Sequence, residues 1–198
     1  MFKSTIKASL YFWVLLLFSA PVFSEWNLVN DKSKLNFISI KASDIAEVHT
    51  FKTLSGSVKK NGEAEVTINI SSLETLIPIR NERMANLLFE TETYPKAVFR
   101  LSVDLDKLFL TKEGESIVSE YKGLLEIKKK QFPLLVKLKV TRLGKESFMV
   151  SSSEPLLLNA DLLGLSGGIE SLRSIAGLPT ISKSVPVTFS LMFRKQEN

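Results

Sequence analysis

Apolar and polar residues alternate along several segments of the chain with a period of two, as they do in β-strands with one buried face. In the run 64–71 every second residue is apolar, and each residue between is polar. The same alternation recurs in 97–105, 134–141 and 185–193. Asn61-Gly62 precedes the first run, and this dipeptide is the strongest short signal for a hairpin. The pattern therefore predicts antiparallel strands joined by tight turns.

Further strand candidates bring the expected total to about eight. They are the hairpin partner 51–58 and three less regular segments, 28–41, 117–128 and 148–153. No Gly-rich or Ser-rich linker divides the chain, which favours a single domain. An antiparallel sheet of eight strands satisfies its edges best by closing on itself. We therefore expect an all-β fold, an eight-stranded antiparallel β-barrel whose interior either packs shut or holds one elongated ligand.

Two short helices are expected to interrupt the strands. Segment 79–88 places Met84, Leu87 and Leu88 on one face and is preceded by Pro78. Segment 169–176 is followed by Gly177, a residue that commonly ends helices, and then by Pro179.

The first 24 residues have the profile of a secretory signal peptide. Lys3 and Lys7 precede an apolar run over 8–20, and Pro21 follows it. The run is shorter than the roughly 20 residues that cross a bilayer. We expect cleavage after Ser24, which leaves one domain over 25–198; an uncleaved anchor is the alternative.

Composition excludes several kinds of chemistry. The chain has no cysteine and a single histidine, His49, so cysteine or histidine-cluster metal sites cannot form within it. The net charge is +5, but the one dense basic run, 128–130, is typical of a solvated hairpin turn, so no nucleic-acid partner is expected. No phosphate-binding loop, paired nucleophile and base, or cofactor-ligating pattern stands out. A protein without an enzymatic activity, a cofactor or a metal is predicted.

Several motifs resemble the signature of the YceI-like, polyisoprenoid-binding family. In that family an arginine-led short helix is followed by a phenylalanine, a Tyr-Pro or Phe-Pro turn and a strand that contains phenylalanine. The corresponding segments here are 80–84, 88–90 and 94–99, and 123–127 with 132–136 resemble the family's Gly-x-Leu and Pro-Val strands. Arg83 replaces a histidine that many members carry on the short helix, so a role tied to that imidazole is not expected here.

The resemblance implies an extended, lipocalin-like barrel in the periplasm. Its interior would hold a long-chain apolar molecule, such as an isoprenoid quinone or a fatty-acid derivative. The protein would then be a carrier or reservoir. The resemblance leaves two further points open: whether the protein transiently contacts a membrane or a membrane protein, and whether it forms a homodimer. The alternative is a non-catalytic stress-response or protein-interaction scaffold with a closed barrel. A third possibility is an accessory role in quinone-linked electron transfer, which would need the same isoprenoid ligand in the barrel.

Candidate ligand-binding residues fall into two groups. The apolar group would line a tunnel, although each member could equally be plain core: Phe37, Phe51, Phe89, Phe99, Leu101, Val136, Phe189 and Leu191. In the polar group, Arg80 and Arg83 could meet a head group, or form a surface pair with Glu82 and Glu90. His49 could hydrogen-bond a ligand oxygen or be a structural residue.

Overall fold

The computed structural model describes residues 26–195, so the predicted signal peptide lies outside the described residues. Twelve strands in this range form one antiparallel sheet. They are β1 (Trp26–Leu28), β2 (Lys34–Lys41), β3 (Ile45–Phe51), β4 (Leu54–Val58), β5 (Glu63–Asn69), β6 (Leu73–Glu74), β7 (Lys96–Ser102), β8 (Ser116–Ile127), β9 (Lys130–Arg142), β10 (Ser147–Ser152), β11 (Leu156–Asn159) and β12 (Ser184–Lys195).

Eight of these strands close into a barrel. The ring runs β1-β4-β5-β7-β8-β9-β10-β12, and pairing of β1 with β12 closes it. The remaining strands lengthen the wall, because β2 pairs with the half of β12 that β1 leaves free, and β3 pairs with β2. β11 likewise pairs with β12 beyond the end of β10. The predicted all-β, eight-stranded antiparallel barrel is confirmed.

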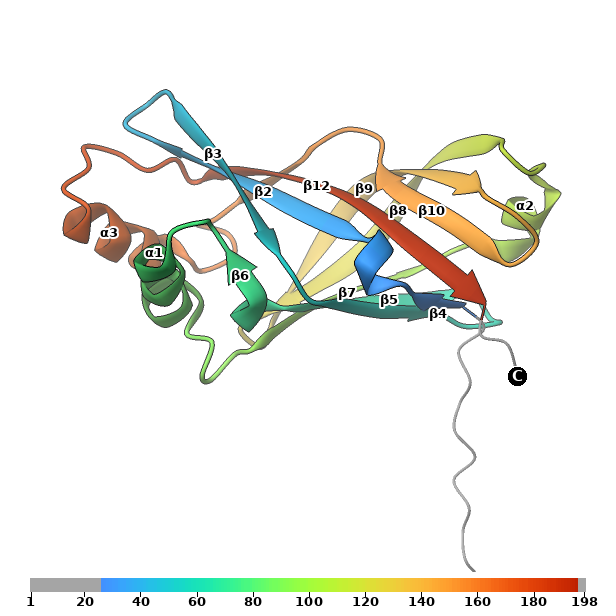
Figure 1. The fold of residues 1–198 in the computed structure, drawn as a ribbon, viewed down its shortest axis with the longest axis horizontal. Helices are drawn as coiled ribbons and strands as arrows, with labels where there is room; N and C mark the ends of the chain where they lie inside the picture. Colours follow the sequence, from blue (N-terminus) through green and yellow to red (C-terminus); the bar gives the residue numbers. More distant parts are fainter. Residues whose placement is uncertain (1–25, 196–198) are drawn as a thin grey trace, which may run out of the picture.

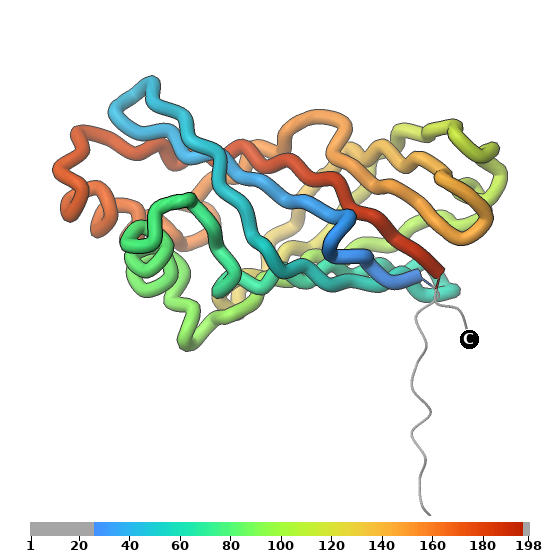
Figure 2. Tube along the Cα trace, in the orientation of Figure 1, coloured from blue at the N-terminus to red at the C-terminus, as the bar shows by residue number. Residues whose placement is uncertain are grey.

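The barrel is elongated, and its two ends differ (Figure 1). One end carries α1 (Pro78–Arg83), α3 (Ser166–Ile175) and the projecting β2–β3 hairpin. The other end carries α2 (Leu105–Leu110). Figure 2 shows that the start of β1 and the end of β12 lie side by side in the half of the barrel toward this end, where the two strands pair antiparallel. Both helices expected from the sequence are present. The first continues from α1 into η3 (Met84–Phe89), one turn of π-helix.

Three strand predictions need correction. The strand expected over 51–58 is divided, because Phe51 is the last residue of β3 and only Leu54–Val58 form β4. The strand expected over 97–105 ends at Ser102, and the unpredicted helix α2 follows. Asp104 caps this helix, since its side chain accepts a hydrogen bond of 3.2 Å from the Lys107 backbone N–H. The strand expected over 28–41 is divided by the 3₁₀ turn η1 (Asn30–Lys32). A similar turn, η2 (Ile70–Ser72), ends the run that begins at Glu63.

The tight turns follow the sequence signals. Asn61-Gly62 joins β4 to β5, and Gly62 adopts a φ of 84° that favours glycine. A Cβ at Gly62 would also lie 2.2 Å from the Val103 carbonyl oxygen. Lys128 and Lys129 of the basic run 128–130 form the β8–β9 turn, as predicted, and both have positive φ.

Aromatic side chains fill the barrel at the α2 end. The Trp26 ring centroid lies 5.5 Å from that of Phe109 and 6.1 Å from that of Phe148, and the two phenylalanine rings are 6.1 Å apart. These tilted and edge-on contacts are favourable aromatic geometries. Trp26 and Phe148 of this cluster also line the interior at the α2 end.

Candidate functional site

The barrel interior contains two adjoining chambers. The mouth chamber, of about 420 Å³, lies at the α1 and α3 end, and the deep chamber, of about 160 Å³, extends toward α2. Five residues line both: Leu35, Ile68, Leu125, Leu158 and Val187. The interior therefore does not pack shut, and its volume lies in the range of ligand pockets.

The two chambers differ in polarity. Every side chain that lines the deep chamber is hydrophobic. The mouth chamber is also mostly apolar, but it includes Ser39, Lys41, Glu47, His49 and both candidate arginines. Exposed residues on α1 take part in its lining, so this chamber reaches the protein surface. The site thus has a polar mouth and an apolar interior.

The helices α1, η3 and α3 pack over one another to cover part of the mouth chamber. Met84, Leu88 and Phe89 are buried from η3, and Ile169 is buried from α3. The contact depends on Gly168, because a Cβ there would lie 2.5 Å from the Leu87 carbonyl oxygen. The close approach of two helical backbones therefore holds this cover in place.

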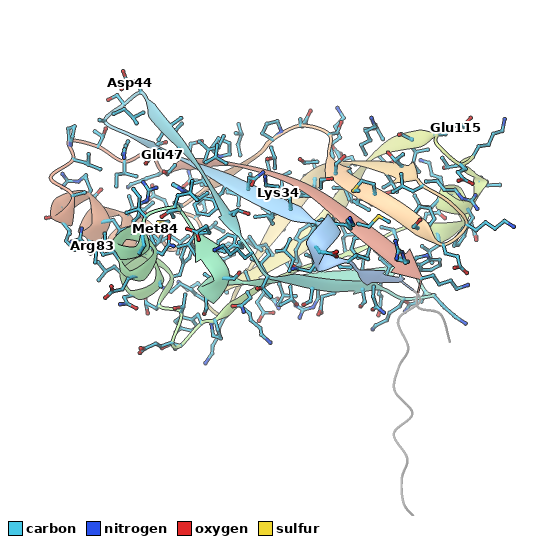
Figure 3. All side chains as sticks on the ribbon, in the orientation of Figure 1. Lys34, Asp44, Glu47, Arg83, Met84 and Glu115 are labelled. Carbon is cyan, nitrogen blue, oxygen red and sulfur yellow. The ribbon has the colours of Figure 1, made fainter. Side chains whose placement is uncertain are left out.

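An ionic cluster lies at the polar side of the mouth chamber. Glu47 Oε2 accepts from Arg80 Nη1 at 2.7 Å and contacts Lys41 Nζ at 2.8 Å. Arg80 Nη2 also donates to the Thr75 carbonyl oxygen at 2.6 Å. The hydrogen bonds from Arg80 and then Lys41 lower the pKa of Glu47 to about 2, so this carboxylate is charged at neutral pH. Figure 3 labels Glu47 on β3, at the same end of the molecule as Arg83 and Met84.

His49 lies beside this cluster and is only 2% exposed. Its Nε2 is 2.7 Å from Ser39 Oγ, and its ring centroid is 5.1 Å from that of Phe37. Burial lowers the pKa of His49, and the positive charge of Arg80 lowers it further. The imidazole is therefore neutral at pH 7.

The loop that leads into α1 presents apolar side chains to solvent. Leu76 is 86% exposed and has a φ of 63°, which is an unusual conformation for leucine. Its backbone N–H donates to Glu74 Oε1 at 2.7 Å, and Asn81 Oδ1 accepts from the Thr75 backbone N–H at 2.9 Å. These hydrogen bonds hold the loop in a defined shape.

Comparison with known proteins identifies the family. A model of the YceI-like domain matches residues 26–193. The chain belongs to the YceI-like family. No curated protein matches this YceI-like chain.

Several solved structures are similar to the YceI-like chain. One is a polyisoprenoid binding domain from Saccharophagus degradans implicated in plant cell wall breakdown, with 36% sequence identity and a TM-score of 0.85. The match covers 87% of this chain and 99% of that one. Burkholderia cenocepacia BcnA, at 22% identity and a TM-score of 0.65 over 83% and 98% of the two chains, shares the fold. So does the Campylobacter jejuni YCEI protein, at 14% identity and a TM-score of 0.54 over 100% of both chains.

The structure places ten of the eleven candidate residues on the chambers of the YceI-like barrel. Six line the mouth chamber: Phe37, His49, Phe51, Arg80, Arg83 and Phe89. Four line the deep chamber: Phe99, Leu101, Phe189 and Leu191. Val136 is buried but lines neither chamber, so its predicted place in the lining is wrong.

The pairing considered for the two arginines is also wrong. Arg80 pairs with Glu47, and Glu90 pairs with Lys128 instead. Within residues 26–195, Arg83 forms no salt bridge. The sequence reasoning missed Ser39 and Glu47, which lie on the inward face of β2 and β3 with Phe37 and His49. The period-two rule could have found them, since each is two residues from a candidate.

Two negative findings apply to the described part of the chain. Residues 26–195 contain no group of three or more acidic, histidine or cysteine side chains that could hold a metal ion. Over the same residues, none of the helices has the length and hydropathy needed to cross a membrane.

Proposed function

We propose that this YceI-like protein is a non-catalytic carrier for one long-chain amphiphile, such as an isoprenoid quinone or a fatty-acid derivative. The observation that carries this proposal is the pair of adjoining chambers, which lead from a polar mouth to an entirely apolar end. The Saccharophagus degradans neighbour, described as a polyisoprenoid binding domain, supports it. The head of the ligand would lie at the mouth and its tail would extend toward Trp26.

The expected signature of such a carrier is an affinity that rises with chain length. Each CH₂ group buried contributes about 0.8 kcal/mol, which corresponds to roughly a fourfold lower Kd. We expect this rise in a titration with saturated fatty acids of increasing length, followed by a plateau once both chambers are filled. Trp26 lines the deep chamber, so its fluorescence should change only when the longer chains bind. An affinity independent of chain length would contradict the proposal.

The Ser39–His49 pair resembles the nucleophile and base of a hydrolase, yet we propose a binding role for it. A catalytic histidine is normally oriented by a third group on its other nitrogen. Here His49 Nδ1 has no hydrogen-bond partner among the described residues, and Glu47 is held by Arg80 and Lys41. We therefore expect ester ligands to be recovered without hydrolysis.

We also propose export to the periplasm and ligand exchange with a lipid surface. Leu76, Ile77 and Ile79 are exposed, and we call them the apolar rim. Ile77 and Ile79 also line the mouth chamber, so a chain leaving the chamber would pass from one apolar surface to the next. A bilayer is the partner that fits, because it is both the source of such chains and an apolar surface.

A matched pair of variants tests the apolar rim. Leu76→Asn removes an exposed apolar side chain, and asparagine tolerates the positive φ of this position. Leu110→Asn is the control, since Leu110 is 85% exposed at the opposite end. We expect the first variant to reduce co-sedimentation with phosphatidylethanolamine–phosphatidylglycerol vesicles several-fold, and the control to bind like the parent. The proposal would be contradicted if the apolar rim bound no vesicles and instead joined two copies of the chain. A dimer that Leu76→Asn dissociates would show this.

A further inference from the structure

The polar end of the mouth chamber contains two buried nitrogen atoms without a hydrogen-bond partner. Among the described residues, His49 Nδ1 and Arg80 Nε are both inaccessible and unpaired. Leaving a buried polar group unsatisfied costs about 1–3 kcal/mol, so native structures rarely do so without a reason. Both residues line the chamber. A ligand atom at this end could satisfy them.

The charges around these atoms do not balance. Lys41, Arg80 and Arg83 line the mouth chamber, and Glu47 is the one acidic residue in its lining. Arg80 and Lys41 share a single oxygen of Glu47, and Arg83 has no carboxylate partner within residues 26–195. The lining therefore carries three cations and one anion. Lys41 and Arg80 are partly buried beside Glu47, and charges in such a setting are screened less by salt than exposed ones, so their excess over the single carboxylate acts on a bound head group. Arg83 is exposed and adds a third positive charge at the chamber opening.

We propose that the polar end of the mouth chamber is a head-group site that selects an anionic head, a carboxylate or a phosphate, over a neutral one on the same tail. This inference rests on the proposed function, because it assumes a tail in the chambers. Arg80 Nε–H would donate to an oxygen of the head. When the Ser39 hydroxyl donates to His49 Nε2, Nδ1 carries the ring proton and donates to the same head. Arg83 would supply the charge that no protein carboxylate neutralises.

Neutral heads would use only part of this site. A quinone carbonyl or an alcohol can accept one of the hydrogen bonds, but it gains little from the excess positive charge. Hydrogen bonds to a charged oxygen are roughly twice as strong as those between neutral groups. The arrangement therefore favours fatty acids and isoprenyl phosphates among the long-chain amphiphiles.

Matched probes that differ only in the head test this inference. Stearic acid is compared with methyl stearate, and geranylgeranyl phosphate with geranylgeraniol, by titration of the protein purified without detergent. We expect each anionic probe to bind at least tenfold more tightly than its neutral partner. The two pairs also distinguish the carboxylate from the phosphate as the preferred head.

Two arginine variants assign the effect to the site. Arg83→Gln should weaken binding of the anionic probe several-fold more than binding of its neutral partner, and so reduce the preference for the anion. Arg173→Gln is the control, because Arg173 lies on α3 at the same end, pairs with Glu170 and does not line the chamber. His49→Phe should also reduce the preference, since it keeps a ring and removes both nitrogens.

The outcomes separate the inference from the function on which it rests. Equal and tight binding of charged and neutral probes would overturn the head-group site and leave the carrier function standing. A preference that Arg83→Gln and His49→Phe both leave intact would also overturn it. No binding of any of the four probes would overturn the carrier function together with the inference.

Discussion

Ala97→Phe should abolish ligand binding without unfolding the protein. Ala97 is buried, lines the mouth chamber and pairs across the sheet with Ile68, which lines both chambers. A phenyl ring at this point would occupy the junction that a long chain must cross. The space is empty of protein atoms, so the ring would fill a cavity instead of overpacking a filled core. We expect a loss of affinity of more than 100-fold in a titration with stearic acid.

Val98→Phe is the matched control for this prediction. Val98 is the next residue of β7, so its side chain points to the other face of the sheet, and it lines neither chamber. The control should bind stearic acid as the parent does, and thermal unfolding should show that both variants are folded. If Ala97→Phe also bound with the parent affinity, the ligand would not lie in the chambers.

Gly168→Ala should loosen the helical cover of the mouth chamber. The new Cβ would lie 2.5 Å from the Leu87 carbonyl oxygen and 2.6 Å from Leu88 Cα, and these backbone atoms cannot rotate away. Overpacking of this kind costs about 1–3 kcal/mol, whereas alanine gains at most about 1 kcal/mol in helix propensity. We expect a Tm several degrees lower and a faster release of bound ligand, measured by thermal unfolding and by dilution kinetics.

The neighbouring glycine provides the control for this second prediction. A Cβ at Gly167 would meet nothing within 4 Å, so Gly167→Ala should leave the Tm unchanged or raise it slightly. If the two variants had the same Tm and the same release rate, the close contact between α3 and η3 would not matter for retention of the ligand.

The barrel could be predicted from the sequence because its strands bury one face and therefore alternate. The predicted strand boundary is wrong where a helix-capping residue competes with the alternation. Val103 and Leu105 continue the period of two, but the Asp104 side chain caps a helix, and Leu108 becomes its buried residue. Periodicity also cannot tell a residue that lines a cavity from one packed in the wall. Val136 shares the inward pattern of its strand and yet touches neither chamber.

The polar end of the site was only partly predictable. His49, Arg80 and Arg83 stood out as rare or clustered residues, but the partner of Arg80 did not. Glu47 lies 33 residues earlier in the chain, and only the return of β3 beside α1 brings the two side chains together. A short-range pattern contains no information on such a pair. The empty volume also depends on how all the side chains pack together, and no local pattern encodes it.

A comparison of native and denatured masses shows whether the barrel holds a long-chain amphiphile. The protein, purified without detergent, would be weighed by mass spectrometry under native and then under denaturing conditions, and an organic extract would be analysed for the molecule that accounts for the difference in mass. We predict a native mass that exceeds the denatured mass by one long-chain amphiphile, which appears in the extract. Equal masses, together with no uptake of added stearic acid, geranylgeranyl phosphate or isoprenoid quinone, would contradict the account.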